Sequence, residues 1–240
     1  MLKIIRLSKV DSTQNFAKKI ADKANDNTVV ISDIQTRGRG RFERTWSSQK
    51  GGLYFSIILK PRIKLNEIFI LTYQMALAVL DSLSKYSEIK LKWPNDVIIK
   101  DKKQQKYRKI CGILTESSIR RNKLNWVIIG VGIDINNTLP KSLRNIAISL
   151  KEIIKKDTSL ELVFAKVIKN FNNYYNNYTY NKTIRKYKTN LAIPNENITF
   201  IYNNNKYIGK ISKVRNDGGL ELILPNQITK IFYSGNIILP

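Results

Sequence analysis

The sequence predicts an α+β fold in which a larger domain, residues 1–190, precedes a small β-barrel, residues 194–240. Three observations carry this prediction. Apolar strand-like runs are interspersed with amphipathic helical patterns in the first part of the chain. Residues 190–197, which include Pro194, have the composition of a linker. After them, short β runs are separated by turn residues such as Asn203–Asn205 and Asn216–Gly219.

The elements of the larger domain follow from periodicity and capping signals. The expected strands are Leu2–Leu7, Val29–Ile34, Leu53–Leu59, Leu91–Trp93, Val97–Ile99, Lys109–Leu114 and Val127–Ile135. The expected helices are Gln14–Ala24, Glu67–Leu83, a short helix that starts with the capping-box spacing Ser149–Glu152, and Ser159–Tyr178. The polar stretch Lys100–Arg108 predicts the tip of a hairpin.

Composition limits the available chemistry. The 240 residues contain no histidine and one cysteine, which excludes a Ser-His-Asp triad, a Cys-His pair, a disulfide and histidine or multi-cysteine metal sites. Any reaction must therefore use Lys, Arg, carboxylates, hydroxyls or backbone groups. A hydrophobic content of 42% without a membrane-length apolar run, and an N-terminus unlike a signal peptide, predict a globular protein of the cytoplasm with no membrane contact.

The formal net charge is +24, which suggests nucleic-acid or acidic partners. The lysines are, however, spread along the chain rather than gathered in one block. We interpret most of this charge as a consequence of composition.

The stretch Gln35–Ser56 is the main candidate for a functional loop. Gly38 and Gly40 permit close backbone approach to a ligand, and Arg39 and Arg41 are among four arginines with forked donors for phosphate or carboxylate. A solvated basic loop and a nucleic-acid-binding tract are the alternatives for this pattern.

Several other residues allow two interpretations. Ser12 and Thr13 fit a helix N-cap, Asp96 fits a turn, and Trp46 fits either a core anchor or a cover over a ligand. Lys109 fits a solvated surface lysine, as most lysines are, or a lysine that faces a ligand, and its position at the start of an apolar strand near Gly112 favours the second interpretation. Gly130 and Gly132 lie in an apolar run and permit close approach of a ring, but they lack the third glycine of a dinucleotide fingerprint.

Four motifs occur in a fixed order. They are GRGR with Trp46 and GGLYFS, KWPND at Lys92–Asp96, KICGIL at Lys109–Leu114, and GVGIDIN at Gly130–Asn136. From about Ser8 to the C-terminus, the chain resembles the catalytic domain of biotin protein ligases. The resemblance implies a mixed β-sheet with helices packed on one face, related to the class II synthetase fold, followed by an SH3-like barrel.

The resemblance also implies an ATP-dependent reaction in two steps. Biotin and Mg²⁺-ATP give biotinyl-5′-AMP, and a lysine of a biotin carboxyl carrier domain then accepts the biotin. Many members repress genes through an N-terminal helix-turn-helix. Because the pattern here begins within about ten residues of Met1, we expect a ligase without specific DNA binding. A homodimer and the Mg²⁺ ligands are left open.

The site residues implied by the resemblance fall into three groups. The catalytic group is Lys109, Arg39, Arg41 and Asp96. The biotin-binding group is Ser12, Thr13, Gln14, Gln35, Gly38, Arg39, Gly40, Arg41, Trp46, Lys109 and Gly112. The nucleotide-binding group is Arg41, Trp46, Asn95, Lys109, Gly130 and Asp134. The chain departs from the family at Gln14 and Asp134, where the family has Asn.

Two other functions are compatible with parts of this pattern. A lipoate–protein ligase shares a related fold, but its arginine-glycine loop differs and it lacks KWPND together with GRGR. A basic nucleic-acid-binding protein without catalysis would use the barrel and the arginine loop.

Overall fold

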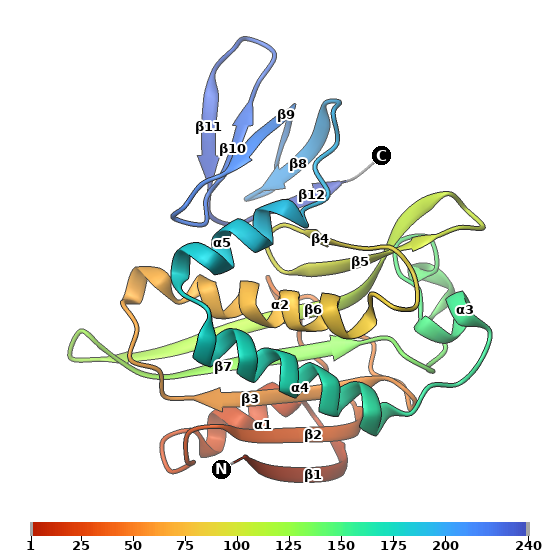
Figure 1. Ribbon diagram of the computed structural model, residues 1–240, viewed down its shortest axis with the longest axis vertical. Helices are drawn as coiled ribbons and strands as arrows, with labels where there is room; N and C mark the ends of the chain where they lie inside the picture. Colours follow the sequence, from red (N-terminus) through yellow and green to blue (C-terminus); the bar gives the residue numbers. More distant parts are fainter. Residues whose placement is uncertain (1, 239–240) are drawn as a thin grey trace.

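The computed structural model describes residues 2–238 and contains a seven-stranded and a five-stranded β-sheet (Figure 1). The strands of the larger sheet are β1 (Lys3–Val10), β2 (Thr28–Gln35), β3 (Leu53–Leu59), β4 (Ile89–Lys92), β5 (Asp96–Asp101), β6 (Lys106–Arg120) and β7 (Lys123–Ile133). Their spatial order is β1-β2-β3-β7-β6-β5-β4. Only β1 and β2 are parallel, so the sheet is mixed as predicted.

Helices cover both faces of this sheet. The helices are α1 (Thr13–Ile20), α2 (Phe69–Leu83), α3 (Leu150–Ile154), α4 (Leu160–Asn177) and α5 (Tyr180–Thr189), with 3-10 turns η1 (Leu65–Glu67) and η2 (Lys141–Leu143). Helices α2 and α4 pack on one face, and α1 packs on the other against Val30, Ile58 and Ile128. The one-face arrangement expected from the resemblance thus describes α2 and α4, while α1, which connects the parallel strands β1 and β2, covers the opposite face.

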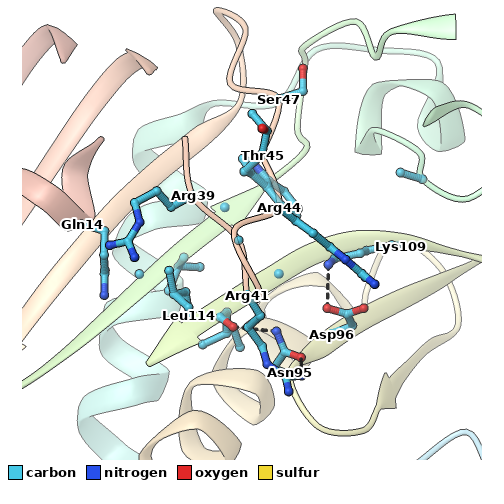
Figure 2. A pocket seen from close by; sticks show the side chains of 18 of the residues that line it. Gln14, Arg39, Arg41, Arg44, Thr45, Ser47, Asn95, Asp96, Lys109 and Leu114 are labelled. Atoms are coloured by element: carbon cyan, nitrogen blue, oxygen red, sulfur yellow. Dashed lines mark hydrogen bonds and ion pairs between the residues drawn. The ribbon is translucent and has the colours of Figure 1, made fainter. Parts of the chain in front are cut away.

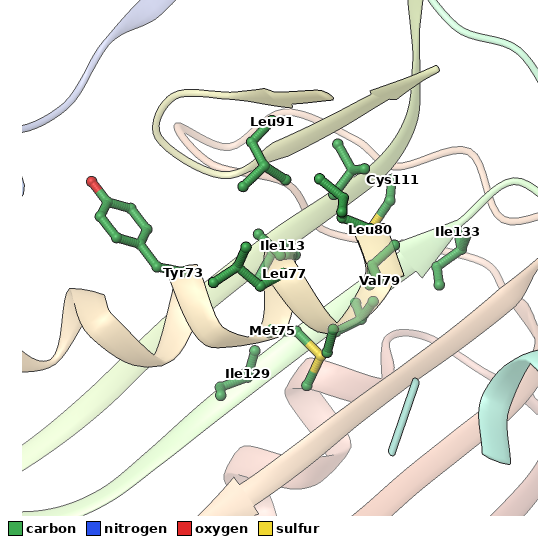
Figure 3. Close-up of a cluster of buried hydrophobic side chains, with 14 of the residues drawn as sticks. Tyr73, Met75, Leu77, Val79, Leu80, Leu91, Cys111, Ile113, Ile129 and Ile133 are labelled. Carbon is green, nitrogen blue, oxygen red and sulfur yellow. The ribbon is translucent and has the colours of Figure 1, made fainter. Parts of the chain in front are cut away.

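The main core lies between α2 and the central strands (Figure 3). Helix α2 is buried around almost its whole circumference because α4 and α5 cover the side turned away from the sheet. Strand β7 is the fourth of seven strands and is buried from Trp126 to Ile133, which confirms the predicted central strand. The middle of the larger sheet is therefore a fully packed part of the molecule.

The five-stranded sheet is antiparallel and follows the order β11-β10-β9-β8-β12. Its strands are β8 (Ile198–Tyr202), β9 (Asn205–Val214), β10 (Leu220–Ile223), β11 (Thr229–Phe232) and β12 (Asn236–Ile238). It lies beyond α5 and β4 at the top of Figure 1. The carbonyl of Gly218 accepts hydrogen bonds from Trp93 Nε1 at 3.0 Å and Tyr73 Oη at 3.1 Å, which attaches this sheet to the larger one.

Most predicted elements are present, with differences at their ends. Strand β3 has the predicted bounds, and the capping box at Ser149 starts α3. Helix α1 ends at Ile20 rather than Ala24, and Asp22, just beyond its end, accepts hydrogen bonds from Asn125 and Trp126. The sequence did not predict α5. It also did not predict that β6 continues past Leu114 to Arg120, or that β7 begins at Lys123 rather than at Val127. The division into domains 1–190 and 194–240 stays a prediction.

None of the helices described between residues 2 and 238 combines the length and hydrophobicity needed to cross a membrane.

Candidate active site

A cavity of about 240 Å³ lies over the glycines of β6 and β7. The walls come from the start of α1, the loop after β2, the β4–β5 turn, the segment 139–147 and the second sheet. Every residue that the sequence predicted for the site lines this cavity except Gly38. Gly38 instead supports the loop from behind, where a Cβ atom would lie 2.5 Å from the Trp46 carbonyl oxygen.

The loop after β2 is folded as a small hairpin over the cavity. Gly40 N donates to the Arg44 carbonyl at 2.7 Å, and Trp46 N donates to the Gly38 carbonyl at 2.9 Å. The tip residues Phe42 and Glu43 have φ values of 53° and 59°. Residues other than glycine rarely adopt this left-handed backbone conformation, which costs about 1 kcal/mol or more per residue. The closed hairpin is therefore held by its contacts rather than by local preference.

Trp46 lies flat against the sheet, where glycines make room for it. A Cβ atom at Gly132 would lie 2.5 Å from Trp46 Cε2 and Nε1, and one at Gly112 would lie 2.7 Å from Trp46 Cζ3. The Trp46 Nε1 is buried and has no hydrogen-bond partner within residues 2–238. Buried donors normally have an acceptor, so this N–H is a donor without its usual partner in a side chain that lines the cavity.

A chain of buried polar groups forms one end of the cavity. Gln35 Oε1 accepts from Thr13 N at 2.8 Å, and Thr13 Oγ1 lies 3.0 Å from Ser56 Oγ. Ser56 Oγ donates to Gln14 Oε1 at 3.0 Å. Ser12 caps α1 and is fully buried. Hydroxyls and amides both donate and accept, so this end suits a small polar ring with both kinds of group.

Charged residues form the other end (Figure 2). Lys109 Nζ lies 2.6 Å from Asp96 Oδ1, and Lys92 Nζ lies 3.8 Å from Asp96 Oδ2. Arg41 extends from the loop and donates to Asn95 Oδ1 at 2.8 Å. Burial lowers the pKa of both Arg41 and Lys92, and Asp96 opposes this effect in each case. Positive charge held out of water in this way suits an anionic ligand.

Asp134 is a second carboxylate in the cavity wall and is almost completely buried. Burial raises the pKa of Asp134 to about 7, although a hydrogen bond from Asn137 Nδ2 at 2.8 Å and the charge of Lys109 act in the opposite direction. Asp134 therefore changes its charge near neutral pH.

Other residues of the site were not predicted. Ser56 has a detectable signal, because it is the one polar residue with a hydrogen-bonding hydroxyl between apolar neighbours in the run Phe55–Leu59. The segment 139–147, Gly235 and Asn236 line the cavity without any such signal. Glu116, which binds Gln14 and Arg39 from behind the cavity, was also missed.

Comparison with known proteins agrees with this geometry. Residues 7–134 match the model of the biotin/lipoate A/B protein ligase family. The chain belongs to this family. A bifunctional ligase/repressor BirA of Bacillus subtilis is 36% identical over 176 residues, which are 70% of this chain and 52% of that protein. A biotin–[acetyl-CoA-carboxylase] ligase of Mycobacterium tuberculosis is 30% identical over 53% of this chain and 46% of its own. This ligase-family chain thus spans about half the length of these curated relatives.

Solved structures match the whole fold. The biotin protein ligase of Aquifex aeolicus, in complex with biotin and ATP, has a TM-score of 0.80 and 30% identity and covers 99% of this chain and 98% of its own. Both sheets of the present ligase-family chain therefore occur together in a protein whose structure contains biotin and ATP.

Proposed function

We propose that this chain is an ATP-dependent biotin–protein ligase. The observation that carries the proposal is the placement of a buried hydroxyl and amide chain and a cationic group, Lys109 with Arg41, at opposite ends of one cavity. Biotin has a polar cyclic urea at one end and a carboxylate at the other. The family membership and the fold support the same assignment.

In the first step, a carboxylate oxygen of biotin attacks the α-phosphorus of ATP. A new P–O bond forms, the bond to the β-phosphate breaks, and pyrophosphate leaves. Two anions must approach each other, so the reaction needs positive charge that is already in place. Lys109 supplies it at the floor, and Arg41 supplies it from the loop. Arg39, which the resemblance also assigned to catalysis, instead pairs with Glu116 at the opposite end of the cavity.

In the second step, a lysine amine of a carrier protein attacks the acyl carbon of biotinyl-5′-AMP. A C–N bond forms, the C–O bond to the phosphate breaks, and AMP leaves. The attacking ammonium must first lose a proton. In this proposal Asp96, which lines the cavity and is 13% exposed, would orient that group and accept the proton. The carrier is proposed to be a biotin carboxyl carrier domain, as the name of the Mycobacterium relative suggests.

The remaining residues divide between the two ends of the cavity. Ser12, Thr13, Gln14 and Gln35 would contact the urea, and Trp46 and Gly112 would contact the rest of biotin. Asn95, Gly130 and Asp134 would contact the nucleotide. Mg²⁺ bound with ATP would neutralise phosphate charge. It needs only one or two protein carboxylates, and Asp96 and Asp134 in the cavity wall would supply them. We expect the reaction to take place in the cytoplasm, where ATP is available.

Isotope exchange between ATP and pyrophosphate tests the proposal. Exchange should require biotin and should not be supported by lipoate in its place. Transfer of radioactive biotin to a purified carrier domain should follow when the carrier is added. Lipoate-dependent exchange would identify a lipoate ligase instead, and absence of exchange with either acid would contradict ligase activity.

A further inference from the structure

Glu116 occupies a position on β6 that links the loop to the biotin end of the cavity. Side chains alternate between the two faces of a strand, so Glu116 lies on the same face as Gly112 and Leu114, which line the cavity. Glu116 itself does not line it. It lies just behind the wall, with 21% of its side chain exposed.

Three side chains from two separate parts of the chain, helix α1 and the loop after β2, meet at this carboxylate. Glu116 Oε2 accepts from Gln14 Nε2 at 2.9 Å and from Arg39 Nη1 at 3.1 Å. Glu116 Oε1 accepts from Arg39 Nη2 at 3.3 Å and from Lys18 Nζ at 2.9 Å. Burial alone would raise the pKa of Glu116, but the hydrogen bonds from Lys18 and Gln14 and the charge of Arg39 lower it below its ordinary value. Glu116 is therefore ionised at neutral pH.

The first consequence concerns the orientation of the Gln14 amide. An ionised carboxylate only accepts hydrogen bonds, so the Gln14 NH₂ group must face Glu116. The Gln14 Oε1 is then turned to Ser56 Oγ and to Gly130, where a Cβ atom would lie 2.5 Å from it. Gln14 thus presents an acceptor to the cavity, and the N–H groups of a cyclic urea require an acceptor.

The second consequence concerns the loop. Arg39 belongs to the hairpin that covers the cavity, and its guanidinium makes a two-pronged contact with Glu116. Figure 2 shows Gln14 and Arg39 close together at this end of the cavity. Two-pronged contacts between arginine and carboxylate are among the stronger hydrogen-bonded pairs. The same carboxylate therefore anchors the loop and orients Gln14.

We propose that Glu116 is a positioning residue that couples closure of the Gly38–Ser48 loop to recognition of the biotin urea. This inference rests on the proposed function. Because coupling between two binding events is reciprocal, biotin should favour the closed loop, and the closed loop should favour biotin. Removal of Glu116 should weaken biotin binding and loop closure together without abolishing the fold, since Glu116 lies outside the hydrophobic core.

Two variants separate the two roles. Glu116→Ala removes both contacts, and Glu116→Gln retains an oxygen that can accept from Gln14 but removes the charge that holds Arg39. Lys18→Met is the matched control, because Lys18 binds the same carboxylate but lines no part of the cavity. Biotin affinity is measured by calorimetry. Loop closure is measured as the rate of tryptic cleavage after the loop arginines, with and without biotin.

Glu116→Ala should weaken biotin binding at least about tenfold, the effect of losing a hydrogen bond to a charged group. Its loop should be cut faster, and biotin should protect it poorly. Glu116→Gln should show the faster cleavage with a smaller loss of affinity. Lys18→Met should resemble the parent in both measurements. Equal affinity and equal protection in Glu116→Ala and the parent would overturn the inference.

A mutant cycle distinguishes coupling from simple loss of packing. Gln14 and Arg39 each contact Glu116, so their effects on biotin affinity should be linked through it. Arg39→Met should weaken biotin in the parent background and have little effect in the Glu116→Gln background, where folding is best preserved. Equal effects in both backgrounds would overturn the coupling. Failure of the parent itself to bind biotin would instead overturn the proposed function, and the inference with it.

Discussion

At the scale of single residues, the site depends on charges whose hydration is restricted. Lys109 Nζ is 5.0 Å from the centre of the Trp46 ring and 2.6 Å from Asp96 Oδ1, so its ammonium is fixed between an aromatic face and a carboxylate. Because this charge is already in place, the protein need not reorganise when a carboxylate and a phosphate meet beside it. This is why substitution of one lysine in a chain of formal charge +24 should have a specific effect.

Lys109→Gln should reduce adenylation by at least about a hundredfold, the scale expected when one positioned electrostatic donor is removed. The glutamine keeps most of the length of lysine, so the fold should be retained. Biotin-dependent pyrophosphate exchange measures the first step, and transfer from purified biotinyl-AMP measures the second. The second step should be affected less, since the charge is needed most when the two anions meet.

Lys100→Gln is the control for this prediction. Lys100 is also ion-paired, with Glu88 at 3.7 Å, and lies on the neighbouring strand, but it does not line the cavity. The Lys100→Gln variant should exchange pyrophosphate at the parental rate. If the Lys109→Gln variant also does so, Lys109 is not part of the reaction.

Asp134 predicts a pH effect on stability. Its pKa is about 7 in the folded protein, above the ordinary value of 3.8, so the folded state binds more protons than the unfolded state between these values. The free energy of unfolding should therefore fall as the pH rises from about 4 to 7. Asp134→Asn removes this fall, and at pH 8 the variant should be more stable than the parent by roughly 1 to 4 kcal/mol.

Urea unfolding at pH 5 and pH 8 measures this effect. Asp157→Asn is the control, because Asp157 is 67% exposed and pairs with Lys151 at the surface. The advantage of Asp134→Asn should grow with pH, whereas Asp157→Asn should follow the parent. An advantage that is the same at both pH values would show that Asp134 does not titrate in this range.

At the scale of secondary structure elements, the outcome for each sequence prediction follows from where the signal lies. The strand Leu53–Leu59 is buried along its length, so its apolar run alone predicted its bounds. Helix α5 was missed because only Thr183, Ile184 and Tyr187 are buried. Tyr187 is buried through stacking on Tyr73 at 3.6 Å, a contact between distant parts of the chain.

The same reasoning applies to the candidate site. The order of the motifs predicted that Arg39, Lys109 and Asp134 lie around one cavity, because the motifs that contain them occur in the same order in the family. Glu116 has no such signal, since its partners Gln14 and Arg39 lie 102 and 77 positions away along the chain. A charged residue at the end of an apolar strand looks like an ordinary surface group until the fold brings its partners together.

The loop after β2 predicts a role in retaining the intermediate. Arg41 ties the hairpin to Asn95 at 2.8 Å and reaches the Gly235 carbonyl at 3.5 Å. The tip has two residues in left-handed conformation, so the hairpin should open when this tie is lost. Arg41→Gly should release free biotinyl-AMP and label neighbouring proteins indiscriminately, as measured by biotin blots after addition of bystander proteins.

Arg37→Gly serves as the control for this variant. Arg37 belongs to the same loop region but is exposed and lies outside the cavity. It should retain the intermediate as the parent does. Equal retention by Arg41→Gly would contradict the view that this loop acts as a lid.

At the scale of the whole molecule, one turn connects the two sheets to the site. Trp93 donates to the carbonyl of Gly218, which lies in the turn between β9 and β10. Asn95 and Asp96, two and three residues after Trp93, line the cavity. Gly235 and Asn236 reach the same cavity from the second sheet. The second sheet is therefore part of the site wall, so the hydrophobic packing of Trp93 against Phe200 also supports the geometry of the site.

The net charge of +24 leads to the last prediction. Basic residues are distributed over the molecule, including Lys182, Lys186 and Lys188 on α5 and Lys206, Lys210 and Lys230 on the second sheet. Such a distribution attracts polyanions through counterion release but does not read a base sequence. We expect weak binding to duplex DNA, equal for unrelated sequences, with an affinity that falls steeply as salt rises.

Fluorescence anisotropy with two unrelated duplexes over a salt series measures both properties. Heparin should displace either duplex equally well, because the attraction depends on phosphate or sulfate charge alone. Biotin and ATP should change the affinity for DNA little, since the lysines of α5 and of the second sheet do not line the cavity. A footprint on one sequence that persists at physiological salt would contradict this prediction, because charge spread over several faces cannot select one site.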